Sequence, residues 1–174
     1  MLTFIVSLVF GIGNLWEHAR YRKKIAAVTL QNPPVFIIGF WRSGTTLLHS
    51  LMCQDHRAGY VTTFHAVFPN LILTQKRWLK SFTNAILPKK RPFDAYPMDM
   101  DFPQEEDFAM MNLQAKSLYK FFYFPKDFDK IYEEELYFEK LPELQRKRWT
   151  DKYMTFINKA MLNTAGKRYI SKNP

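Results

Sequence analysis

Residues 35–49, VFIIGFWRSGTTLLH, combine an apolar run with a short loop that contains two glycines. The run at 35–39 is rich in β-branched and aromatic residues, which is typical of a buried parallel strand. Residues 45–54 carry apolar side chains at helical spacing. We therefore expect the loop at 39–46 to lie at a helix N-terminus, where unpaired amide groups and the helix dipole bind phosphate or sulfate oxygens.

The glycine spacing of this loop is that of the nucleotide-binding motif GxxxxGK[ST], but Thr45 stands where that motif has its lysine. A nucleoside triphosphatase uses the lysine as a charge on the β and γ phosphates, so its absence argues against ATP or GTP hydrolysis. Arg42 instead offers a planar guanidinium that can bind a terminal oxyanion through two hydrogen bonds. The alternative enzyme class is a kinase-like phosphoryl-transfer protein, which would also need a magnesium-binding aspartate.

With these residues the chain resembles the sulfotransferases that use 3′-phosphoadenosine 5′-phosphosulfate (PAPS), in the branch with an R-S-G-T-T loop. That branch includes the tyrosylprotein sulfotransferases and many bacterial enzymes. Three segments occur in the family's order: PPVFIIGFWRSGTTLLH at 33–49, PQEEDFAMMN at 103–112 and RYISKNP at 168–174. This ordered set covers nearly the whole chain and is much more specific than the loop alone.

The resemblance implies in-line transfer of a sulfuryl group from PAPS to a hydroxyl or amine, without a metal ion. Lys172, the lysine of the Lys-x-Pro segment, would reach the bridging oxygen or the sulfuryl group and stabilise the departing charge. The donor would be bound by residues of the loop, namely Gly39, Arg42, Ser43, Gly44, Thr45 and Thr46. Family members are longer than this chain, so we expect an N-terminal fragment that need not be active alone; the other alternative is a noncatalytic, membrane-associated remnant.

A general base for the acceptor hydroxyl is less clearly marked. Tyrosylprotein sulfotransferases take it from a glutamate in a segment ending in proline, but the corresponding residues 61–69, VTTFHAVFP, contain no glutamate. His65 is one substitute, and its alternative role is structural. Glu105 and Glu106 are the other candidates, and their alternative role is to complement the dipole at a helix start. We interpret His18, His49 and His56 as structural.

The N-terminal segment is apolar and then basic. Residues 1–16 contain no charged side chain, and Arg20, Arg22, Lys23 and Lys24 follow. The apolar run is shorter than the ~20 residues of a membrane span and lacks the features of a secretory signal. Either it forms a helix packed on the domain or a partner, or it is an interfacial anchor on anionic headgroups. We divide the chain into this helix, residues 1–30, and the N-terminal part of a sulfotransferase domain, residues 31–174.

The formal net charge of +9 is concentrated, because residues 56–93 contain no acidic side chain. Positive potential there would attract an anionic nucleotide or membrane surface. No nucleic-acid-binding signature accompanies it, so nucleic acid is not an expected partner. We expect a cytoplasmic protein, with peripheral membrane contact as an option, acting on a small-molecule, lipid or glycan acceptor. Its aromatic side chains would suit an apolar acceptor, for example Phe64, Phe68, Phe93 and Tyr96. Cys53 is interpreted as a core residue.

These residues require an α/β scaffold to bring them together. Helices are expected over 71–84, 103–118 and 142–165, with Gly166 ending the last one, and residues 168–171 are expected to form a second strand. Strand, crossover helices and strand predict a right-handed parallel arrangement with the ligand at the carboxyl ends of the strands. The expected fold is a P-loop-like, three-layer α/β fold with a central parallel sheet, incomplete in this chain.

Overall fold

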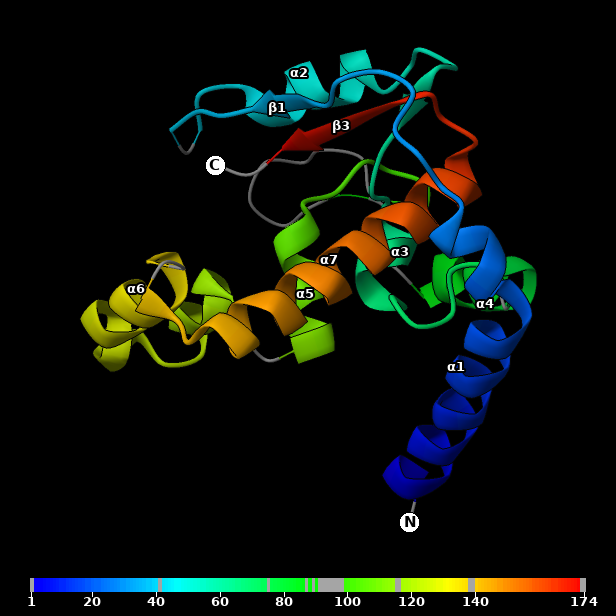
Figure 1. Ribbon diagram of the computed structural model, residues 1–174, viewed down its shortest axis with the longest axis horizontal. Helices are drawn as coiled ribbons and strands as arrows, with labels where there is room; N and C mark the ends of the chain where they lie inside the picture. Colours follow the sequence, from blue (N-terminus) through cyan, green and yellow to red (C-terminus); the bar gives the residue numbers. More distant parts are fainter. Residues whose placement is uncertain are drawn as a thin grey trace.

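The computed structural model of the chain describes residues 2–40, 42–74, 76–86, 88, 90, 99–114, 117–137 and 140–172. Several residues that the sequence predictions include lie outside these ranges: Trp41 of the loop, Lys89 and Arg91 of the basic stretch 56–93, the aromatic residues Phe93 and Tyr96, and the Asn173 and Pro174 that follow Lys172. The described chain is a mixed α/β structure, in which a small parallel sheet has one helix on one face and the other helices gathered on the other (Figure 1).

The sheet has three strands, β1 (Val35–Ile37), β2 (Ala58–Gly59) and β3 (Arg168–Lys172), in the order β1-β3-β2. Both pairings are parallel, with Ile37 opposite Lys172 and Ala58 opposite Arg168. The parallel pairing of the two predicted strands is confirmed. β2 was not predicted, because two small residues give no periodic signal. The register places the end of β3 beside the point where β1 runs into the glycine-containing loop.

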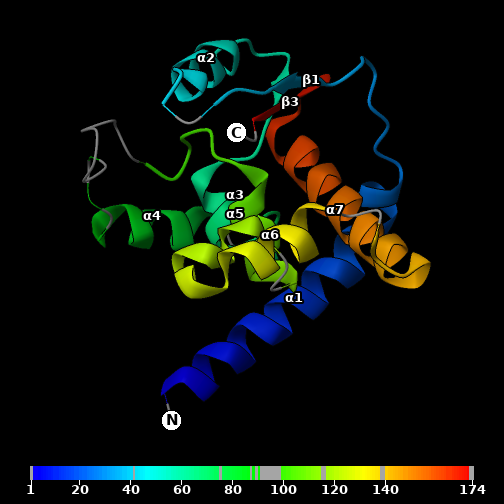
Figure 2. The ribbon, with the colours of Figure 1, turned by 90° about the vertical axis from the view of Figure 1, so that its left-hand side faces the viewer.

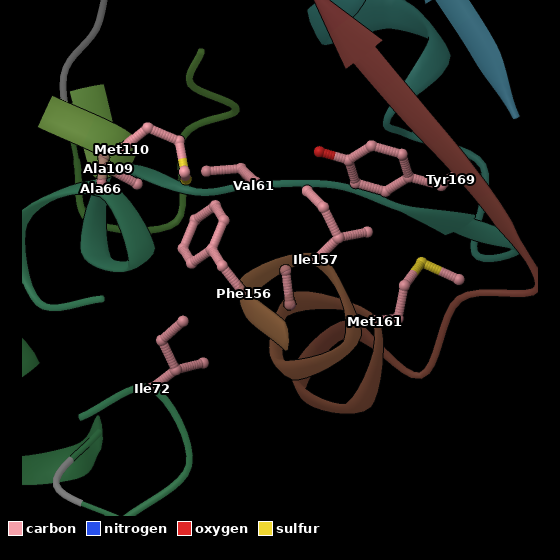
Figure 3. Close-up of a cluster of buried hydrophobic side chains, with 10 residues drawn as sticks. Val61, Ala66, Ile72, Ala109, Met110, Phe156, Ile157, Met161 and Tyr169 are labelled. Atoms are coloured by element: carbon pink, nitrogen blue, oxygen red, sulfur yellow. The ribbon is translucent and has the colours of Figure 1, made fainter. Parts of the chain in front are cut away.

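Helices α2 (Thr45–Met52) and α7 (Glu143–Thr164) lie on opposite sides of the sheet in both views (Figures 1 and 2). The apolar stripe predicted for the long helix is confirmed, because Phe156, Ile157, Ala160 and Met161 of α7 are buried. They form the main core with Val61, Ile72 and Tyr169, among others (Figure 3). The crossover between β1 and β3 is thus held to the sheet by one face of α7.

The helix predicted over 103–118 is shorter at both ends in the structure. α5 spans Glu106–Gln114, and the 3-10 helix η1 (Leu118–Phe122) begins after Ser117, whose hydroxyl accepts a hydrogen bond from the Tyr119 amide at 3.1 Å. A serine that caps a new turn competes with helix continuation. A second 3-10 turn, η2 (Pro125–Asp127), and α6 (Phe128–Leu136) follow and were not predicted.

The helix predicted over 71–84 is wrong at its start. Residues 71–74 form turns, and α4 spans Lys76–Ile86. The amides of Leu73 and Thr74 donate instead to Glu17 Oε2, at 2.9 and 3.1 Å. A buried carboxylate of α1, far away in the sequence, therefore holds these two amides in the turns that precede α4. The remaining helix between β2 and α4 is α3 (Thr63–Val67).

Gly166 has a different role from the predicted helix stop. Ala165 is the residue that ends α7 in the left-handed conformation, with φ 53°. A Cβ atom on Gly166 would lie only 2.2 Å from the backbone nitrogen of Gly59. Glycine is required there because the chain leaving α7 passes directly against β2.

The C-terminal part of the N-terminal helix α1 (Leu2–Ala26) packs on α7, while the N-terminal end of α1 projects away from the sheet (Figures 1 and 2). Packing on the domain was the first of the two alternatives drawn from the sequence. Within the described ranges no helix is both long and apolar enough to cross a membrane.

Candidate active site

The loop at 39–46 is folded tightly by its two glycines. A Cβ atom on Gly39 would lie 2.7 Å from Thr45 Cγ2, and Gly44 precedes α2 with φ +89°, which side chains disfavour. The Ser43 amide donates to the Phe40 carbonyl at 3.2 Å, and the Gly44 carbonyl accepts from the Leu48 amide at 3.1 Å. The loop thus turns sharply from β1 into the first turn of α2.

The face of this loop is open. Arg42, Ser43 and Gly44 are exposed, and no side chain caps the amides at the start of α2. Arg42 itself has φ 66°. Non-glycine residues rarely adopt this conformation, and the residues that do are concentrated at functional sites. The structure places all the donor-binding candidates of the sequence, from Gly39 to Thr46, in this one turn at a helix N-terminus. Such a turn can accept oxyanion oxygens.

Lys172 connects the loop to the second candidate segment. Its Nζ donates to Thr46 Oγ1 at 3.2 Å and forms an ion pair with Glu105 Oε1. The side chains of Lys172 and Glu105 are only 6% and 11% exposed, so the pair is shielded from water. Three residues that are far apart in the chain and were each proposed from sequence therefore meet at the carboxyl end of β3.

Glu105 is held from both sides. The segment before it is fixed by an antiparallel bridge between Thr62 and Pro103 and by a hydrogen bond from the Gln104 amide to the Val61 carbonyl, at 2.8 Å. Its Oε2 accepts a hydrogen bond from the phenol of Tyr119. Burial and the neighbouring carboxylate Glu105 raise the pKa of Tyr119, so this phenol remains a donor. Each oxygen of Glu105 thus has a defined partner.

Glu106 belongs to a different environment, although it is the next residue. Its Oε1 accepts from the phenols of Tyr169 at 2.7 Å and Tyr153 at 3.5 Å, which come from β3 and α7. Burial raises the pKa of this carboxyl group, which is 1% exposed. Burial, followed by the charge of Glu106, also raises the pKa of Asp107, to about 6. Glu106 therefore ties α5, α7 and β3 together inside the protein.

His65 is fully buried as part of a helix cap. Its Nδ1 accepts from the Thr62 amide at 3.2 Å, its own amide donates to Thr62 Oγ1, and its Nε2 lies 2.5 Å from Asn163 Nδ2. Both ring nitrogens are thus engaged in stabilising α3 against α7. The structure does not bring His65 into the group around Lys172, so its position matches the structural alternative from the sequence.

His49 lies under this group, on α2. It is buried, and desolvation together with the charge of Lys172 lowers its pKa from 6.5 to about 4. The ring is therefore neutral at physiological pH and adds no second cation beside Lys172. On the same helix side, burial raises the pKa of the Cys53 thiol to about 12, which agrees with the interpretation of this residue as core.

Sequence reasoning missed the tyrosines of the site. Tyr119, Tyr153 and Tyr169 supply the phenols that hold Glu105 and Glu106. Only Tyr169 left a signal, because the alternation of β3 places it on the face of the strand opposite Lys172. Phe64, one of the aromatic residues considered for an acceptor, is instead fully buried in a core cluster with Leu71 and Met100. The described residues contain no group of three or more metal-ligating side chains.

Comparison with known proteins gives a consistent assignment. Over its full length the chain is 29% identical to the omega-hydroxy-beta-dihydromenaquinone-9 sulfotransferases Stf3 of Mycobacterium bovis and Mycobacterium tuberculosis. It spans 44% of the length of each of these relatives. No solved structure matches it significantly. The model of the sulfotransferase family matches residues 33–164, and the chain belongs to this family.

Proposed function

We propose that this chain carries the donor-binding loop and the charge-stabilising lysine of a PAPS-dependent sulfotransferase with a P-loop-like, three-layer fold. The observation that carries the proposal is the position of Lys172, whose Nζ bonds both Thr46 of the loop and Glu105. A cation between an oxyanion loop and a carboxylate can stabilise charge on the group being transferred. By moving toward that group, it also frees the carboxylate to accept the acceptor's proton.

In this proposal the loop binds the phosphosulfate. The amides at the start of α2 and the Arg42 guanidinium would donate hydrogen bonds to its anionic oxygens. Thr45 occupies the position of the lysine that a triphosphate would require. Lys172 would stabilise the negative charge that builds up as the bond between sulfur and the bridging oxygen breaks. That electron pair leaves on the phosphate of the donor, while a new bond forms between sulfur and the acceptor oxygen.

Glu105 is our choice for the general base, and Glu106 is assigned a positioning role. Glu105 Oε1 faces Lys172, so a donor that draws Lys172 toward the loop would free this oxygen to accept the acceptor's hydroxyl proton. Tyr119 would continue to hold Oε2 and keep the carboxylate oriented. Glu106 is engaged by the phenols of Tyr169 and Tyr153 and has no comparable access.

The acceptor is proposed to be a hydroxyl on an apolar molecule, in line with the dihydromenaquinone in the names of the two relatives. A row of aromatic rings leads away from Glu105. Tyr119 lies 5.7 Å from Phe122, and Phe121 lies 4.3 Å from Phe122 and 5.6 Å from Phe128, measured between ring centroids. Phe122 is 65% exposed, so an apolar acceptor could lie along this row while its hydroxyl reaches Glu105.

The test is a transfer assay with two labelled donors, PAPS carrying radioactive sulfur and ATP carrying radioactive γ-phosphorus, and isoprenoid and phenolic alcohols as acceptors. We expect transfer from PAPS only, and its loss in Lys172→Met. Lys130→Met is the matched control, because Lys130 is exposed and pairs only loosely with Glu134, at 4.0 Å. Transfer from ATP, or equal activity in the two lysine variants, would refute the proposal.

A further inference from the structure

Helix α1 has one face fastened to the domain. Gly13, Glu17, Tyr21 and Ile25 recur at intervals of four and lie on one side of the helix. Glu17 and Ile25 are buried, and a Cβ atom on Gly13 would lie 2.8 Å from Leu71 Cδ2. This row is the inner face of α1.

The attachment is polar and specific. Glu17 Oε1 lies 2.8 Å from Lys159 Nζ on α7, and both side chains are buried. The other carboxylate oxygen accepts from the amides of Leu73 and Thr74 and from the Thr74 hydroxyl. This buried ion pair, together with the three hydrogen bonds to Glu17 Oε2, fixes the rotation of the helix about its axis. The opposite face is therefore held outward and is not free to turn into the core.

That outer face is apolar toward the N-terminus and basic after it. Ile12, Leu15 and Trp16 are 60%, 72% and 54% exposed. At about 100° per residue, these three side chains lie on the side of the helix away from the inner row, and Lys23 continues the same side. Arg20, Arg22 and Lys24 are also exposed. Glu17 is the one acidic residue of 2–26, and it is paired inside the protein.

Charge decides which partner suits this face. A second copy of α1 would place the basic cluster against itself or against exposed apolar side chains, which is unfavourable in either orientation. Anionic lipid headgroups would attract the basic residues, while the region beneath them would accept the isoleucine, leucine and tryptophan.

We propose that the outer face of α1 docks on an anionic membrane surface. Ile12, Leu15 and Trp16 enter the boundary between headgroups and acyl chains, and Arg20 and Lys23 contact lipid phosphates. The proposal concerns only α1 and holds whether or not the chain transfers sulfuryl groups.

The test is sedimentation of the full chain with vesicles of phosphatidylcholine alone or mixed with phosphatidylglycerol. We expect binding to the mixed vesicles only, weakened by added salt. Each serine substitution at Ile12, Leu15 or Trp16 should lower the vesicle affinity roughly tenfold. Each of Arg20→Gln and Lys23→Gln should lower it roughly fivefold.

The matched control is the pair Tyr123→Ser and Leu144→Ser, since these residues are 70% and 60% exposed and lie outside both α1 and the basic stretch 56–93. They should leave vesicle binding unchanged, and circular dichroism should show that all variants are folded. Three results would overturn the proposal: no vesicle binding by the unmodified chain, an equal loss of binding in the control variants, or self-association that disappears with the α1 substitutions in a chain that does not bind vesicles.

Discussion

The loop at 39–46 and the segment of Glu105 and Glu106 build the two sides of the candidate site in opposite ways. The loop is open to solvent and is shaped by backbone: two glycines, a residue with positive φ and an uncapped helix start. The carboxylate segment is closed and is shaped by side chains, with a lysine and three phenols around two acidic groups. Lys172 is the side chain that touches both.

This difference separates two functions of a transfer site. An open backbone cradle suits an anion that must enter and leave, whereas a closed side-chain network suits groups that must keep their orientation. Substitutions in the loop should therefore change the free energy of unfolding little. Substitutions in the carboxylate segment should change both the free energy of unfolding and the chemistry.

The largest effect is expected at the shielded ion pair. Lys172→Met leaves Glu105 without its cation, and the free energy of unfolding should fall by about 3–5 kcal/mol. The double variant with Glu105→Gln removes the uncompensated charge, so urea titration should show recovery of most of this loss. Sulfuryl transfer should stay low in both. A single variant as stable as the unmodified chain would show that the pair is not buried in solution.

A smaller effect, on the order of 3 kcal/mol, is expected from His49 at acid pH. Its pKa is about 4 in the folded protein and 6.5 ordinarily, so the unfolded chain binds the proton first. This contribution to stability is complete above pH 6.5 and is lost as the pH falls to about 4. Between pH 7 and about pH 4, the free energy of unfolding should fall less in His49→Gln than in the unmodified chain. An equal fall in the two proteins would contradict the burial of the ring beside Lys172.

On the loop side, Gly44→Ala should cost about 1–2 kcal/mol, because an alanine at φ +89° is strained. No atom lies within 4 Å of the position of the added Cβ, so the cost should come from backbone conformation alone. Gly44→Asn should recover part of it, since asparagine tolerates this region better. Thermal unfolding of the two variants measures the difference, and an asparagine less stable than the alanine would argue against the left-handed turn.

The smallest effect is expected for Glu106→Gln, at about 1 kcal/mol or less near neutral pH. The amide oxygen can still accept from Tyr169, and the substitution removes a carboxyl group whose ionisation is opposed by burial. Because the pKa of this carboxyl is raised, its ionisation destabilises the folded chain as the pH rises, so the variant should gain relative stability toward alkaline pH. If the transfer activity of Glu106→Gln fell as far as that of Glu105→Gln, this result would contradict the roles assigned to the two residues.

The sequence predicted the two sides unequally well, for a physical reason. The loop is a local structure, and its glycine spacing, Arg42 and Thr45 lie within eight consecutive positions, 39–46. The carboxylate segment depends on contacts across long separations, such as the 67 positions between Glu105 and Lys172. Lys172 and Glu105 were named through the family resemblance, but Tyr119, whose phenol binds Glu105, had no pattern to reveal it.

The choice between Glu105 and Glu106 also could not be made from sequence. It depends on where α5 begins, since Glu106 is its first residue and Glu105 precedes it. A helix start one residue earlier would rotate both side chains relative to β3. Element boundaries are the least certain part of a sequence-based prediction. His65 illustrates the same limit, because its role follows from a cap with Thr62 and from Asn163, far along the chain.

The most direct test of the account is calorimetric titration of adenosine 3′,5′-bisphosphate, the donor's product, into the unmodified chain, Arg42→Ala and Glu105→Gln. Removing a charged hydrogen-bonding group of the loop should weaken binding by about 1.5–3 kcal/mol, whereas Glu105→Gln should leave the affinity close to that of the unmodified chain. If Glu105→Gln abolished binding while Arg42→Ala had no effect, the loop would not be the donor site and the assignment of the two sides would be wrong.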